Sequence, residues 1–121
     1  MNKDEALHAF WQSFGWTTYD ENTVPENAEM PRLTYNVVLA SFNEPQAMTA
    51  SLWDRTRSWQ RISDKAAEIG REIGRGGIML PIDDGAIWIK RGDPFSQRVS
   101  DEDDTIRRII INIEAEFISA D

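Results

Sequence analysis

The segment 105–118, TIRRIIINIEAEFI, is the feature that most narrows the folds open to this chain. From Ile109 onward, apolar residues occupy every second position: Ile109, Ile111, Ile113, Ala115 and Phe117. The positions between them are mostly polar: Arg108, Ile110, Asn112, Glu114 and Glu116. Successive side chains of a strand point to opposite faces, so this alternation predicts a long strand with one apolar face. Such a face has to be covered by another layer of the fold.

Two amphipathic helices are expected to supply that layer. Residues 59–74 carry apolar side chains every three or four positions, with Ser58 placed to cap the start and Gly74 the end. Residues 3–14 show the same spacing, with Asn2 or Asp4 as the cap and Gly15 as the stop.

The remaining segments have the composition of strands and loops. We expect four further strands, at residues 33–42, 49–59, 78–82 and 86–90. Turns are expected at Asn43-Glu44-Pro45 and at Asp83-Asp84-Gly85, the latter a hairpin signal. Two segments are expected to be loops: 17–32, which has two prolines and four acidic residues, and 91–104, which has glycine, proline and an acidic cluster. The sequence therefore predicts a single α+β domain, residues 1–121, with two helices on a largely antiparallel or mixed sheet of about five strands.

The composition excludes several classes of protein. The chain has 21 acidic and 13 basic residues and a net charge of −8, which disfavours a conventional DNA-binding surface. It has no cysteine, so neither disulfides nor thiolate metal sites are possible. No apolar run reaches the roughly 18 residues of a membrane span, and the start has no signal-peptide pattern. We expect no membrane partner.

A search for catalytic chemistry gives no positive signal. His8 is the only histidine, and GREIGRGG (70–77) lacks the Lys-Ser/Thr ending of a phosphate loop. A small metal-dependent enzyme would need carboxylates of Asp83, Asp93 and Asp103 to converge. Aspartates in turns are explained by backbone geometry alone, so we expect no enzyme and no cofactor.

Arg91-Gly92-Asp93 matches the tripeptide that cell-surface receptors recognise on extracellular ligands. A three-residue match arises often by chance, and nothing else in the sequence indicates an adhesin. We interpret the segment as a loop in which Gly92 permits a bend, Pro94 fixes it and Phe95 anchors it. Arg91 and Asp93 would then be free to contact a partner.

Most of the chain, from about Pro31 to Phe117, resembles a family of phage proteins. The resemblance rests on PRLTYNVV, SLWDRTRSW, GGIMLPIDDGAIWIKRGDPFSQ and DTIRRIIINIEAEF, in that order. These segments are similar to the tail terminator, or tail-completion, proteins of long-tailed bacteriophages and prophages. Head–tail joining (neck) proteins are similar in size and fold, and they remain the alternative.

The resemblance implies a structural role in the virion. Such proteins form a ring, usually a hexamer, which caps the tail tube, ends its polymerisation and offers the surface to which the head docks. The implied partners are further copies of this chain, the tail tube protein and head–neck proteins, with DNA only as passing cargo. The implied place is the tail–head junction, reached from the host cytoplasm during assembly.

A ring needs contacts in which one patch meets a different patch of the neighbour. Arginine-rich and acidic patches on opposite flanks, with tryptophan anchors, would meet that need. The expected interface residues are Trp53, Arg55, Arg57, Arg91, Asp93, Phe95 and Arg98. Packing within the subunit remains an alternative for Trp53, Trp59 and Phe95. A host-protein adaptor that binds through the loop 17–32 is a further alternative function.

Overall fold

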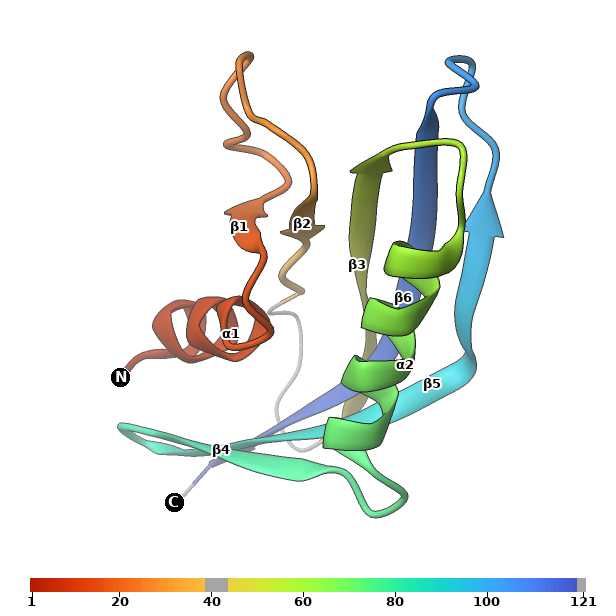
Figure 1. The fold of residues 1–121 in the computed structure, drawn as a ribbon. Coiled ribbons are helices and arrows are strands. Elements are labelled where there is room, and N and C mark those ends of the chain that lie inside the picture. The colour runs from red at the N-terminus through yellow and green to blue at the C-terminus, as the bar shows by residue number, and fades with distance from the viewer. Residues whose placement is uncertain (39–43, 120–121) are drawn as a thin grey trace.

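The computed structural model describes residues 1–38 and 44–119. In this part of the chain two helices and six strands form an α+β fold with a curled, mixed sheet (Figure 1). In chain order these are α1 (Lys3–Gln12), β1 (Thr17–Asp20), β2 (Arg32–Tyr35), β3 (Pro45–Arg55), α2 (Gln60–Ile73), β4 (Ile78–Ile82), β5 (Gly85–Val99) and β6 (Ile106–Ser119). The strands lie in the order β1-β2-β3-β6-β5-β4, with β1 parallel to β2 and every other pair antiparallel.

β6 lies inside the sheet, as its alternating sequence predicts. It pairs with β3 over the whole of β3 and with β5 on its other side. The five apolar residues Ile109, Ile111, Ile113, Ala115 and Phe117 are all buried in the core. Burying a large aliphatic or aromatic side chain stabilises a fold by about 1.5–3 kcal/mol, so this face contributes a large share of the core.

Both helices pack against the same hydrophobic core. α2 buries Ile62, Ala66, Ile69 and Ile73, which are the positions that its spacing predicts. α1 buries Leu7, Phe10 and Trp11, while Phe14, just beyond its end, is buried as well. The start of α1 is a capping box, in which the Asn2 side chain accepts a hydrogen bond from the Glu5 amide and the Glu5 side chain accepts one from Asn2.

An ion pair joins α2 to β3. The Asp54 side chain points to the core side of β3 and is almost fully buried, with 1% of it exposed. Arg61 donates to both of its carboxylate oxygens, from Nε at 2.8 Å and from Nη2 at 2.6 Å. This bidentate bond satisfies the buried carboxylate and fixes the first turn of α2 on the sheet. The expected cap, Ser58, lies one residue before the N-cap, which is Trp59 and makes no side-chain capping bond. Ser58 Oγ accepts a hydrogen bond from the Gln60 amide at 3.1 Å.

The structure corrects the expected boundaries at the N-terminal side of the sheet. The segment 17–32, predicted to be a loop, begins with the four-residue strand β1, so that the loop itself covers residues 21–31. The strand expected at 33–42 ends at Tyr35. Asn36 explains why the strand ends here. Its backbone N–H donates to the Thr49 carbonyl at 3.0 Å, while its side-chain Oδ1 accepts a hydrogen bond from the Thr49 backbone N–H at 2.9 Å. A side chain thus replaces the backbone acceptor that a regular ladder would use.

Residues 39–42 of that expected strand, and Asn43 of the expected turn, lie outside the described residues. The second expected strand, 49–59, is β3, which starts earlier, at Pro45, and ends at Arg55. Its predicted antiparallel pairing with the preceding strand is confirmed.

The β4–β5 hairpin turns at Asp83 and Asp84, as predicted, because Ile82 pairs with Gly85. The segment 91–104 does not form a single loop. Its first nine residues, Arg91 to Val99, continue β5, and only residues 100–105 connect β5 to β6. The Arg-Gly-Asp segment therefore lies within a strand.

Candidate functional site

A corner in β5 places the Arg-Gly-Asp segment. Arg91 pairs with Ile113 and Ser96 with Ile111, so residues 92–95 of β5 stand opposite the single residue Asn112. Figure 1 shows the sharp bend that β5 makes between its two halves. A bulge that adds residues to one strand bends that strand and re-aims its side chains. The two halves of β5 consequently run along different parts of the molecule.

Asn112 of β6 fixes the corner. Its side-chain nitrogen donates a hydrogen bond to the Pro94 carbonyl at 3.0 Å, and the Asp93–Pro94 peptide bond is cis. A β-carbon on Gly92 would lie 2.8 Å from the Asn112 carbonyl oxygen. Gly92 does not adopt the left-handed backbone, so close approach to β6 is the reason for glycine here. The expected anchor role of Phe95 is compatible with its packing against the core.

Beyond the corner, a groove separates α2 from the second half of β5. Its volume is about 480 Å³, and the half-buried ring of Phe95 lies against Gly70 of α2. Arg71 of α2 and Arg91 and Arg98 of β5 line this groove. We call it the arginine groove. It unites three of the residues expected at an interface: Arg91, Phe95 and Arg98.

The three guanidinium groups of the arginine groove have no carboxylate within ion-pair distance among the described residues. Arg91 Nε donates to the Gly74 carbonyl at the end of α2, at 3.0 Å. The Arg98 guanidinium lies 4.6 Å from the centre of the Trp59 ring, a cation–π contact. Neither contact neutralises a charge. In a chain with a net charge of −8, the arginine groove is therefore a local positive site.

The arginine groove borders an open strand edge. β4 pairs only with residues 85–89 of β5, and residues 96–99 of β5 pair with β6 on one side. No described strand pairs with their other side. Ser96, Gln97 and Arg98 are exposed there. Their free backbone groups can accept another strand.

Trp53 lies elsewhere, on the face of the sheet opposite the core. Its indole Nε1 donates to Thr34 Oγ1 at 3.0 Å, and its ring lies between the guanidinium groups of Arg108 at 4.4 Å and Arg32 at 5.6 Å. Its neighbour Leu52 points into the core, as the predicted alternation requires. The structure does not bring Trp53 to the arginine groove.

Arg55 and Arg57 lie at the end of β3 beside the loop between β5 and β6. Arg55 Nη1 is 3.5 Å from Asp103, and Arg57 Nη2 is 3.7 Å from Asp104. Hydrogen bonds from Thr105 lower the pKa of Asp103, with a smaller contribution from Arg55. All four charged side chains are substantially exposed, so these pairs add little stability. The two arginines thus already face acidic residues of their own chain.

Asp93, the remaining expected interface residue, is exposed at the corner. Sequence reasoning missed Arg71 and Gly70 of the arginine groove. Arg71 lies on a flank of α2 outside its apolar stripe, and the helix sequence does not show which strand lies beside that flank. Arg71 in the last turn of the helix was the available signal.

His8 is half-buried, and its Nδ1 is 3.0 Å from the hydroxyl oxygen of Tyr35. Burial raises the pKa of the Tyr35 hydroxyl. The contact joins α1 to β2 and gives His8 a place in the packing of the fold.

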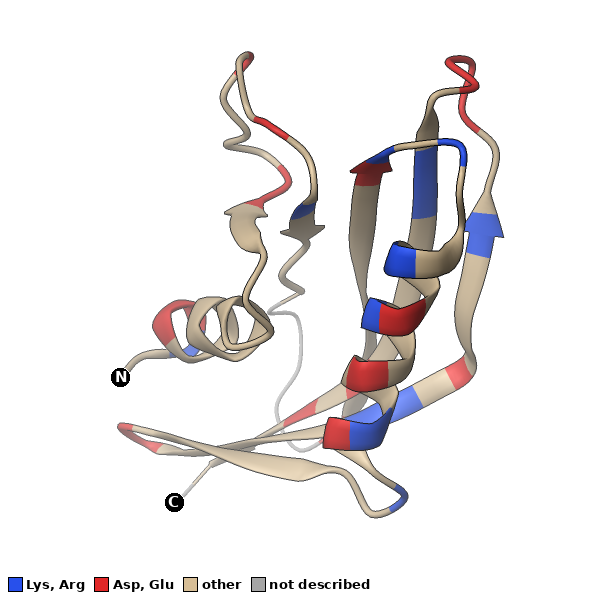
Figure 2. Cartoon of the chain, in the orientation of Figure 1, with Lys and Arg blue, Asp and Glu red and all other residues tan. Residues whose placement is uncertain are grey.

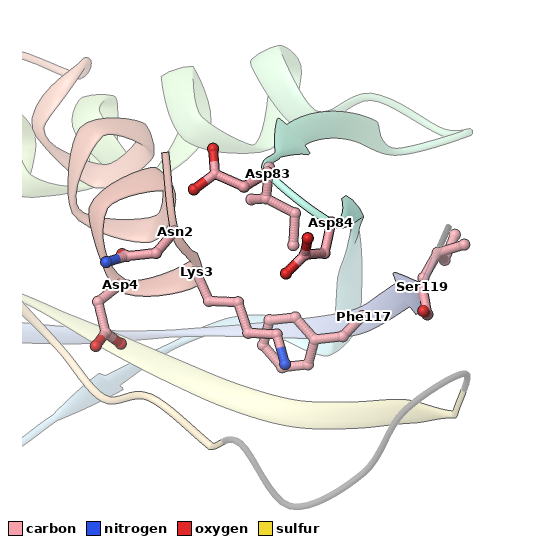
Figure 3. A pocket seen from close by; sticks show the side chains of 9 residues that line it. Asn2, Lys3, Asp4, Asp83, Asp84, Phe117 and Ser119 are labelled. Carbon is pink, nitrogen blue, oxygen red and sulfur yellow. The ribbon is translucent and has the colours of Figure 1, made fainter. Parts of the chain in front are cut away.

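A second hollow, of about 400 Å³, lies between the start of α1 and the β4–β5 turn (Figure 3). Lys3 lies over the Phe117 ring, with Nζ 4.6 Å from its centre. Asp83 accepts a hydrogen bond from the Met1 amino group at 2.7 Å, which raises the pKa of that group. Asp4, Asp83 and Asp84 also line this hollow.

The three aspartates that a metal-dependent enzyme would need lie in different parts of the fold. Asp83 is in the β4–β5 turn, Asp93 is at the corner of β5, and Asp103 is in the β5–β6 loop. Within residues 1–38 and 44–119, no group of three or more His, Asp or Glu side chains could hold a metal ion.

No helix in the described ranges is long and apolar enough to cross a membrane. Comparison with known proteins found no family model that matches the chain and no matching curated protein.

Proposed function

We propose that this chain is a ring-forming structural subunit that caps the tail tube of a long-tailed bacteriophage or prophage. It ends tube polymerisation and offers the surface to which the head docks. The resemblance of residues 31–117 to tail terminator proteins is the origin of this proposal. The structural observation that supports this proposal is that the two ends of the sheet differ in charge and in the strand edges they present.

At one end β1 is the terminal strand, and it leads into the acidic loop 21–31. Toward the other end lies the open edge of β5 with the arginine groove. In Figure 2 the β1–β2 loop carries acidic residues, whereas across the molecule the second half of β5 carries basic residues and α2 carries basic and acidic residues together. Contacts between two unlike surfaces repeat from copy to copy and close into a ring when the rotation allows. A subunit with an unpaired strand edge and a different charge at each end of its sheet can make such contacts.

The net charge of the subunit fits the same role. Each copy carries −8, so a ring of several copies carries a strongly negative field. Such a field repels the phosphate backbone of DNA, which prevents passing DNA from adhering to the ring. The acidity that disfavours ordinary DNA binding therefore suits a conduit for DNA.

Deletion of the gene from the phage that carries it, followed by electron microscopy of the particles, tests this function. Tails that grow to abnormal and variable lengths support a terminator. Tails of normal length that lie unattached beside filled heads would instead assign the protein to head–tail joining. Normal, infectious particles would refute both roles.

A further inference from the structure

The loop 21–31 carries three glutamates on the surface of the subunit. Glu21, Glu26 and Glu29 are exposed. None of them lies within ion-pair distance of a basic group in the described parts of the chain. The arginine groove holds three arginines in the complementary situation, Arg71, Arg91 and Arg98. Exposed charges of opposite sign that have no ion-pair partner among the described residues of one subunit point to a partner in another.

We propose that the arginine groove of one subunit receives the loop 21–31 of a second copy of this chain. In this contact β1 of the second copy extends the sheet along residues 96–99 of β5. The proposal rests on the ring-forming function above and names the surfaces that make the ring.

The two strand edges match in length and direction. β1 has four residues, and the open segment of β5 pairs four residues with β6. Following the pairings across the sheet, β1 runs opposite to β5. A neighbour related by rotation about an axis along the strands would thus place its β1 antiparallel to β5. Main-chain hydrogen bonds of such an added strand provide affinity, while side-chain charges provide specificity.

The other acidic loop of the molecule fits the arginine groove less well. In the β5–β6 loop, Asp103 and Asp104 already face Arg55 and Arg57, and Asp103 also accepts hydrogen bonds from Thr105. Moving these carboxylates to another subunit would break existing contacts. The glutamates of the loop 21–31 give up no ion pair of the described residues when they dock.

Charge reversal tests the contact in the assembling phage. The deletion strain is complemented with one of three variants: Arg71→Glu with Arg98→Glu, Glu26→Arg with Glu29→Arg, or all four changes in one chain. We expect the first two to lower incorporation of the protein into particles by about tenfold or more, because each replaces attraction by repulsion. The variant with all four changes reverses the sign of both surfaces, so it restores the attraction and should recover much of the incorporation.

Two matched variants control for charge alone. Arg75→Glu changes an exposed arginine that does not line the arginine groove, and Glu102→Arg reverses an exposed glutamate of the β5–β6 loop. Both should assemble like the wild type. Circular dichroism of each purified variant establishes that it is folded. If the reversed variants assemble like these controls, or if the variant with all four changes fails to recover, the contact is refuted.

Cross-linking identifies the partner surface directly. The chain has no cysteine, so Asn27→Cys with Gln97→Cys introduces the only two thiols and leaves the charges of the loop 21–31 and of the arginine groove in place. Treatment of purified particles with a short bismaleimide should give a ladder of covalent oligomers, which requires each subunit to link to two neighbours. If particles that contain the variant have tails of normal length but give no ladder of cross-linked oligomers, this contact is overturned and the proposed function stands. Absence of the unsubstituted protein from wild-type particles would overturn both.

Discussion

Replacement of Gly92 by alanine tests the structural explanation of the Arg-Gly-Asp segment. The new β-carbon would lie 2.8 Å from the Asn112 carbonyl oxygen and 2.9 Å from its carbonyl carbon. These atoms belong to the backbone of β6, which pairs with strands on both sides. The clash cannot be relieved by rotating a side chain. A shift of β5 or β6 is required.

The expected cost follows from two opposing effects. Extra atoms in a well-packed region typically destabilise a fold by about 1–3 kcal/mol. Replacing glycine by alanine also restricts the unfolded chain, which returns roughly 0.4–1 kcal/mol. We therefore expect the free energy of unfolding to fall by about 1–2 kcal/mol. For a chain of this length the melting temperature should fall by about 4–8 °C.

Urea and thermal unfolding followed by circular dichroism measure the change. Gly76→Ala is the matched control, because a β-carbon at Gly76 would meet no atom within 4 Å and its backbone is not left-handed. This variant should be as stable as the wild type or slightly more stable. If Gly92→Ala is as stable as Gly76→Ala, then close packing against Asn112 is not what requires glycine at this position.

Three further outcomes are expected. Phe95→Ala should lower stability by about 2 kcal/mol, less than a fully buried ring would cost, since the ring is half-buried. Arg91→Ala, which loses one hydrogen bond to Gly74, should leave the melting temperature nearly unchanged and weaken assembly; equal melting temperatures for these two variants would contradict the distinction. Thr105→Val should raise the pKa of Asp103 toward its ordinary value of 3.8, which an NMR titration measures. Because this pKa is lowered in the fold, the carboxylate stabilises the protein above about pH 4, and the contribution is lost as the pH falls below it.

The elements with strong periodic patterns were predictable from sequence. β6 has a period of two over its second half, and α2 has an apolar stripe with a period near 3.6, so each pattern had one interpretation. Asp83-Asp84-Gly85 predicted the β4–β5 hairpin because Asp-Gly is favoured in the tight turns that join antiparallel strands. These patterns are local and record which side of an element is buried.

Two errors arose where pairing between distant segments decided the structure. β1 has only four residues, and its Thr17-Thr18-Tyr19 sequence favours a strand but is too short to show a period; its parallel pairing with β2 decides the structure. In β5, Gly92 and Pro94 are residues typical of turns, so the sequence predicted a loop there. In the structure both lie in a bulge of β5, and the Asn112 side chain donates a hydrogen bond to the Pro94 carbonyl within this bulge.

The expected interface residues were only partly brought together. Arg91, Phe95 and Arg98 meet at the arginine groove because the corner of β5 turns its second half along α2. Trp53 lies on the opposite face, and Arg55 and Arg57 face acidic residues of their own chain. Arg71 of α2 also lines the arginine groove. The sequence of α2 alone does not show that β5 packs beside this side of the helix.

Cryo-electron microscopy of intact particles tests the central claim most directly. At the head-proximal end of the tail tube, we expect a ring of identical subunits into which this α+β fold fits, with β1 of each copy beside β5 of the next. A ring at that position built from a different fold, with this chain absent from the particle, would contradict the account.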